Sequence, residues 1–242
     1  MQEYNIPFNQ LEVIGLSREI LEKMPEEFIR DLKSGALTAL VITQIKAANG
    51  AQVEMPVKLK LGLDENGREK LTVFPVNREF TNELKLDNEL FTRLRSGDIL
   101  HYQGEYLQRD PETNSILRVS DEEMKIEQRF ADIEKFHDIE LGIEQKNQLK
   151  NGKPVVLDIG GEEVVVDLDL KNPNFYKSLK GDLNDWEYNK KVDYDILHPE
   201  YVGVVKTDEN RWEYQQIMLA DKFPQQELDS KQKQTVSSGM KR

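Results

Sequence analysis

The sequence predicts an α+β fold in which short helices each lead into an antiparallel hairpin or meander. Apolar and polar residues alternate in several short segments, which is typical of strands with one buried face. Turn-forming pairs, such as Gly160 with Gly161, separate these segments. The pattern leucine, basic residue, small polar residue, glycine occurs at residues 32–35, 94–97 and 149–152, each time between a helical and an alternating segment.

This four-residue pattern has the chemistry of a helix end. A basic residue in the last turn interacts favourably with the helix dipole, and glycine adopts the left-handed conformation that a Cβ atom penalises. The three copies lie 62 and 55 residues apart and have matching flanks, so the sequence predicts an internal repeat of helix–hairpin units. The alternative is that leucine and glycine at this spacing are simply how helices end.

The first unit, residues 1–82, is predicted to hold helices followed by a three-stranded meander. Apolar residues recur at near-helical spacing from Leu11 to Leu32, and Pro25 among them fits the start of a helix better than its interior. Strands are expected at 37–45, 53–63 and 71–74, with a tight turn at Asn49 and Gly50. The helices should cover one face of this sheet.

The second and third units follow the same order on a smaller scale. Residues 83–135 are predicted as a helix, a hairpin around the turn at 110–114 and an acidic linker; Pro111 presets φ in that turn. Residues 136–172 are predicted as a helix and a tight hairpin, with strands at 154–159 and 164–170.

Aromatic residues distinguish the C-terminal part of the chain. Both tryptophans and five of the eight tyrosines lie between residues 176 and 214. Residues 173–221 are predicted as a small helix–hairpin module, the helix ending before His198 and Pro199, and residues 222–242 as a flexible tail. Large side chains fill the core of a small module, but they also form stacking platforms for a nucleotide or single-stranded nucleic acid. The candidate stacking residues are Tyr176, Trp186, Lys190, Trp212 and Tyr214.

The net charge of −12 is concentrated in one block of the chain. Residues 121–169 carry 14 acidic and 6 basic residues, a balance of −8. Such a block is usually a solvated surface, but an acidic face also attracts a basic partner or imitates nucleic-acid phosphate. No metal site is predicted, because the alternating pair Asp167 and Asp169 lacks a third oxygen ligand in the sequence. The candidate partner-binding residues are Asp158, Glu162, Glu163, Asp167 and Asp169.

Motifs for catalysis are absent from the sequence. The chain has no cysteine, its three histidines lie in different units, and it has no phosphate-binding glycine loop, nucleophile elbow or zinc-binding helix motif. We therefore expect no enzymatic activity and no cofactor. Because no segment of about 20 apolar residues and no signal peptide is found, we expect a cytoplasmic protein without membrane association.

Two parts of the sequence resemble uncharacterised families. One resemblance is carried by Ile6-Pro7-Phe8-Asn9-Gln10-Leu11-Glu12, Gly15-Leu16-Ser17-Arg18-Glu19, Leu32-Lys33-Ser34-Gly35 and Asp110-Pro111-Glu112-Thr113-Asn114. These segments look like an N-terminal domain family common on conjugative and other mobile elements of Bacteroidetes. A second family, which often follows the first and is also appended to type IA topoisomerases, is similar at Ile139-Glu140-Leu141, Gln145, Leu149 and Gly152-Lys153-Pro154-Val155.

The resemblance to the second family is lost soon after Gly160 and Gly161, and no topoisomerase or primase motif is present. It therefore implies a mobile-element setting and no particular activity. Together the observations favour a non-catalytic accessory or adaptor protein that binds another protein, with a DNA-processing enzyme as the implied partner. Two alternatives stay open. One is an acidic inhibitor that imitates nucleic acid or sequesters a nucleotide, and the other is a single-stranded nucleic-acid binder that uses the C-terminal aromatic residues.

Overall fold

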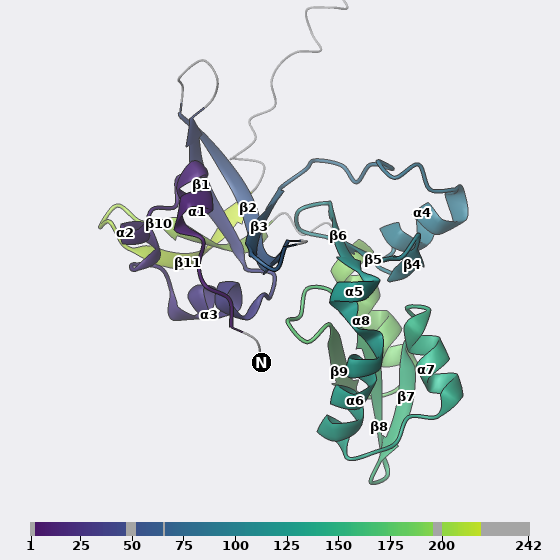
Figure 1. Cartoon of the computed structure of the whole chain (residues 1–242). Helices are drawn as coiled ribbons and strands as arrows, with labels where there is room; N and C mark the ends of the chain where they lie inside the picture. The colour runs from purple at the N-terminus through teal and green to yellow at the C-terminus, as the bar shows by residue number, and fades with distance from the viewer. Residues whose placement is uncertain (1–2, 47–51, 65, 196–199, 219–242) are drawn as a thin grey trace, which may run out of the picture.

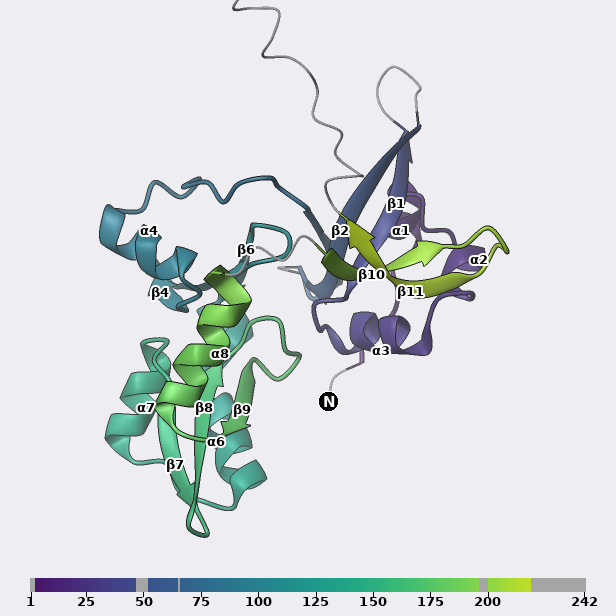
Figure 2. The same cartoon turned by 180° about the vertical axis from the view of Figure 1, so that it is seen from behind.

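The computed structural model describes residues 3–46, 52–64, 66–195 and 200–218, and it confirms the α+β class. Helices and three mostly antiparallel sheets form two lobes (Figure 1). The first lobe contains the largest sheet, and the second contains the two smaller sheets, as the view from behind also shows (Figure 2). Three predictions fall outside the described residues: the turn at Asn49 and Gly50, the helix end at His198 and Pro199, and the C-terminal tail.

The largest sheet combines the predicted meander with a hairpin from the C-terminal part of the chain. Its strands are β1 (Leu40–Lys46), β2 (Gln52–Leu63), β3 (Glu69–Pro75), β10 (Glu200–Lys206) and β11 (Trp212–Met218), in the order β11-β10-β1-β2-β3. β1 pairs antiparallel with β2 and parallel with β10, where Leu40 lies opposite Gly203. A segment close to the C-terminal end thus completes the N-terminal sheet.

Three short helices cover one face of this sheet: α1 (Phe8–Val13), α2 (Arg18–Leu21) and α3 (Glu26–Ser34) (Figure 1). Ser17 caps α2, because its hydroxyl oxygen accepts a hydrogen bond from the N–H of Ile20 (3.4 Å). Pro25 is the N-cap residue of α3, so this proline precedes a helix, as predicted. The core of the first lobe lies between these helices and alternate residues of β2, namely Val57, Leu59 and Leu61.

The second lobe begins with α4 (Asn88–Arg95) and a three-stranded sheet of β4 (Leu100–Tyr102), β5 (Glu105–Asp110) and β6 (Ser115–Ser120). Two helices follow, α5 (Asp121–Met124) and α6 (Ile126–His137), where the sequence predicts the acidic linker. α7 (Ile143–Lys150) leads into the third sheet, formed by β7 (Val155–Ile159), β8 (Glu162–Leu168) and β9 (Tyr176–Lys180). α6 and α7 pack on one face of the third sheet, and α8 (Leu183–Asp195) lies on the other (Figure 2).

Each of the three leucine–glycine patterns ends a helix. α3, α4 and α7 are followed by Gly35, Gly97 and Gly152, whose φ angles are 76°, 89° and 67°. The strands β1, β4 and β7 come next along the chain. The left-handed cap is therefore present in all three places, while the internal repeat stays a prediction.

The two lobes share part of their core. Phe74 of β3 belongs to the same buried cluster as Tyr106 and Leu117 of the second sheet and Leu168 of the third. Of the elements described within the predicted module at 173–221, β9 and α8 belong to the second lobe and β10 and β11 to the first.

Candidate binding cleft

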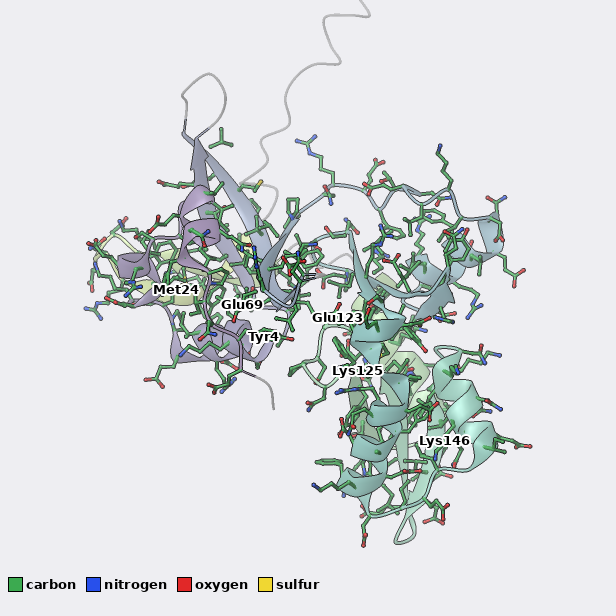
Figure 3. The ribbon with its side chains drawn as sticks, viewed as in Figure 1. Tyr4, Met24, Glu69, Glu123, Lys125 and Lys146 are labelled. Atoms are coloured by element: carbon green, nitrogen blue, oxygen red, sulfur yellow. The ribbon has the colours of Figure 1, made fainter. Side chains whose placement is uncertain are left out.

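A cleft of about 1060 Å³ lies between the two lobes. Tyr4 and β2 contribute to one wall, and α5, α6 and the loop before β9 contribute to the other. Figure 3 shows Tyr4 on the first lobe, with Glu123 and Lys125 on the facing side of the second. A second hollow of about 810 Å³ adjoins the cleft and shares Lys60 and Glu123 with it. These two residues therefore lie where both hollows meet.

Lys60 reaches the base of the cleft because side chains alternate along β2. Its neighbours Leu59 and Leu61 point into the core of the first lobe, so Lys60 points toward the second lobe. The Nζ atom donates a hydrogen bond to the carbonyl oxygen of Leu170 (2.5 Å). Burial lowers the pKa of Lys60 to about 8, although the nearby negative charges of Glu123 and Asp169 act to raise it. An additional anion in the cleft would raise this pKa.

Phe175, in the loop before β9, contacts two cations. The Nζ of Lys60 lies 4.8 Å from the centre of its ring, and the guanidinium carbon of Arg129 lies 5.8 Å from it. Arg129 also forms an ion pair with Asp132 (3.2 Å) and donates a hydrogen bond to the carbonyl oxygen of Asn174 (3.4 Å). The φ of Phe175 is 60°, a left-handed conformation uncommon for a large side chain. These contacts fix the loop against β2 and α6.

Tyr4 and Glu123 complete the floor of the cleft. Tyr4 packs on Gly35, where an added Cβ atom would lie 2.5 Å from the ring carbon Cε2 of Tyr4. Partial burial raises the pKa of the Tyr4 phenol, and the nearby Glu123 carboxylate raises it further. Burial also raises the pKa of Glu123, against the attraction of Lys60 and Lys70. The floor thus carries both signs of charge in a partly dehydrated setting.

The rim of the cleft is apolar at two points. Phe136, near the end of α6, is 69% exposed, and Leu63, at the end of β2, is 43% exposed. Lys135, next to Phe136 in the sequence, and Lys125, the N-cap residue at the other end of α6, also line the cleft and are exposed; neither forms an ion pair with another described residue. Exposed aromatic side chains beside cations are common at protein-binding surfaces.

The five acidic residues predicted to form one face are divided in the structure. Asp158, Glu162 and Glu163 are exposed around the turn between β7 and β8, and Glu162 forms an ion pair with Lys180 (2.6 Å). Asp167 and Asp169 are only 7% and 8% exposed. Asp167 lies near the end of β8, the central strand of a sheet with helices on both faces, and Asp169 follows directly after this strand, so these two carboxylates are covered. The exposed acidic face is therefore corrected to three residues. Among the described residues, no group of three or more His, Asp or Glu side chains could hold a metal ion.

The predicted stacking residues are also separated. Trp186 is 4% exposed, and the Nζ of Lys177 lies 4.3 Å from the centre of its ring. Lys190, on the same helix, forms an ion pair with Asp98. Tyr176 begins β9, whereas Trp212 and Tyr214 lie on β11 and pack against the core of the first lobe. The structure thus brings no platform of these five side chains together.

The sequence analysis missed the charged residues between the lobes. The Nζ of Lys58 lies 3.1 Å from the Oδ1 of Asp110 and 2.8 Å from the Oε2 of Glu112. The side chains of Lys58 and Asp110 are 8% and 1% exposed. Alternation along β2 indicates a polar face at Lys58 and Lys60, but it does not indicate that another lobe covers that face. The only signal for Asp110 is its place in a turn.

Residues 1–85 match a family described as a protein of unknown function, DUF4099. The match spans α1 to α3 and β1 to β3, and it supports the resemblance of the N-terminal part to an uncharacterised domain. No curated protein and no solved structure matches the chain. No helix in the described ranges is long and apolar enough to cross a membrane.

Proposed function

We propose that the protein is a non-catalytic adaptor that binds a segment of another protein in the cleft between its lobes. The observation that carries this proposal is the combination of exposed apolar side chains, Phe136 and Leu63, with a charged floor in one cleft. Apolar anchors surrounded by polar groups are typical of sites that bind polypeptides.

The charges of the cleft favour a polypeptide over a nucleic acid. Its lining contains four basic side chains (Lys60, Lys125, Arg129 and Lys135) and four acidic ones (Asp64, Glu122, Glu123 and Asp132). A phosphate backbone gains affinity from an excess of basic residues, whereas a polypeptide presents groups of both signs. The resemblance of the sequence to mobile-element families supports a DNA-processing enzyme in the cytoplasm as the partner.

Photo-crosslinking from two exposed positions tests the proposal. A photoreactive amino acid replaces Phe136 in one variant and Ile143 in the other; Ile143 is 78% exposed and lies outside the cleft lining. In the host cell we expect one protein to crosslink from position 136 and not from position 143, because only the former lies in the cleft.

The crosslink from position 136 should be lost when Lys125 and Lys135 are both replaced by glutamate, because two unpaired cations of the rim become anions. Crosslinking of the same proteins from both positions would contradict the proposal. A nuclease-sensitive product from position 136 would instead support the nucleic-acid alternative.

A further inference from the structure

The outer edge of β9 presents backbone groups that the third sheet does not use. β9 is an edge strand, because the strand order is β7-β8-β9. The N–H of Asp169 donates to the carbonyl oxygen of Phe175 (2.9 Å), and the N–H of Gly181 donates to that of Glu163 (3.0 Å). These bonds flank the pairs of Tyr176 with Leu168 and of Lys180 with Val164.

Pairs flanked in this way are the non-hydrogen-bonded pairs of an antiparallel ladder. The N–H and C=O of Tyr176 and Lys180 therefore point away from β8. Because hydrogen-bonded and non-hydrogen-bonded pairs alternate along the ladder, the N–H and C=O of Ser178 point away from β8 as well. None of these three residues forms another backbone hydrogen bond in the described part of the chain. In Figure 2, no strand lies beside this edge. Three N–H and three C=O groups thus face outward in a row.

The edge begins inside the cleft. Tyr176 lines the cleft, and Ser178 and Lys180 continue the strand away from it, both exposed. We propose that the partner segment is an extended strand that pairs with Tyr176, Ser178 and Lys180 along the outer edge of β9. This inference rests on the proposed function, because it describes how the segment bound in the cleft is held. Strand addition would satisfy all six outward groups at once.

The side chains near this edge indicate the chemistry of the segment. Tyr176 packs on the side of the sheet that α6 covers, and Ser178 and Lys180 share that side because strand residues alternate. Phe136 and Lys135 of α6 line the cleft together with Tyr176. The face of the added strand toward α6 should therefore carry an apolar side chain for Phe136 and a carboxylate for Lys135.

A second copy of this chain fits the edge less well. Each chain carries a net charge of −12, so two copies repel one another. A segment from a different protein has no such restriction. The occupant is therefore a partner strand rather than the β9 of another molecule.

Peptide selection tests this inference. A displayed library of random peptides of roughly twelve residues, long enough to form a strand, is selected on the full chain. Peptides that bind the wild-type chain but not the Phe136→Asp variant are defined as cleft-binding peptides. Among them, Ser178→Pro should lower affinity at least about tenfold, because proline removes an outward N–H and its ring blocks an approaching strand.

Gln216→Pro is the matched control. The N–H of Thr207 donates to the carbonyl oxygen of Arg211 (2.8 Å), so the adjacent pair of Lys206 with Trp212 is a non-hydrogen-bonded pair. Every second residue of β11 from Trp212 onward therefore has its N–H and C=O outward, and Gln216 is one of them. Gln216 thus has the same outward position on the edge strand β11 as Ser178 has on β9. Its replacement should leave peptide affinity unchanged. In wild-type protein, bound peptide should slow amide exchange at Ser178 and Lys180 at least about tenfold, but not at Lys177 and Leu179, which already bond to β8. This measurement needs no variant to fold.

Each other outcome overturns a defined statement. Strand addition is overturned if cleft-binding peptides bind Ser178→Pro as tightly as wild type and do not slow amide exchange at Ser178. The adaptor proposal stays in place in that case. A library without any cleft-binding peptide overturns both. A wild-type dimer that Ser178→Pro dissociates would show that a second copy is the occupant and would overturn the choice of a foreign strand.

Discussion

At the scale of single residues, Asp167 shows how burial changes a side chain that the sequence analysis assigns to an acidic surface. It lies on the central strand β8, where its Oδ1 accepts a hydrogen bond from the N–H of Leu168 (2.9 Å). Burial raises its pKa from 3.8 to about 7, against the attraction of Lys190 and Lys177. Near neutral pH this carboxyl group is therefore partly protonated, and it contributes less negative charge than the sequence suggests.

The raised pKa of Asp167 makes stability depend on pH in a defined direction. The folded protein binds this proton more tightly than the unfolded chain, so the contribution to stability is complete below about pH 4 and is lost as pH rises through about 7. Asp167→Asn keeps the hydrogen-bond acceptor but does not titrate. From pH 4 to pH 8, the free energy of unfolding of this variant should rise relative to wild type by at most about 4 kcal/mol, measured by urea unfolding. A difference in free energy of unfolding that does not change between pH 4 and pH 8 would contradict the assignment.

At the scale of the elements, Gly152 does more than end α7. A Cβ atom at this position would lie 2.1 Å from the carbonyl oxygen of Ile99, directly before β4. Gly160 has a similar φ of 64°, but no atom lies within 4 Å of its would-be Cβ. We expect Gly160→Ala to cost about 1–2 kcal/mol for its left-handed conformation and Gly152→Ala to cost at least about 3 kcal/mol, because backbone atoms must also move. Equal losses in thermal or urea unfolding would refute the close approach.

The same glycine shows which features a sequence can predict. The end of α7 at Gly152 depends on residues within one or two turns, so spacing and composition indicate it; the β7–β8 hairpin is predicted for the same reason. The contact with Ile99 joins residues far apart in the chain and has no local signal. The parallel pairing of β1 with β10 is missed for this reason, and so are the cleft residues Lys60 and Arg129.

At the scale of the whole molecule, one buried ion pair joins the two lobes beside the cleft. Lys58 comes from the first lobe, and Asp110 comes from the β5–β6 hairpin of the second. Burial favours the neutral form of both groups, but their mutual attraction outweighs it. The pKa of Lys58 is consequently raised, with Glu112 contributing, and that of Asp110 is lowered, with Thr113 contributing a hydrogen bond. The pair therefore stabilises the protein at neutral pH, and the contribution is lost as pH falls through the lowered pKa of Asp110 or rises through the raised pKa of Lys58.

Removal of Lys58 should loosen the junction between the lobes. Lys58→Met leaves the 1% exposed carboxylate of Asp110 without its buried cation, and it should lower the free energy of unfolding at pH 7 by about 3–5 kcal/mol. Adding Asp110→Asn removes the stranded charge and should recover part of that loss, because the amide oxygen still accepts the hydrogen bonds from Thr113. Lys23→Met, at an exposed lysine, should change stability by less than about 0.5 kcal/mol. If Lys58→Met unfolds in urea like Lys23→Met, the two lobes are held together by their shared apolar cluster and not by this ion pair.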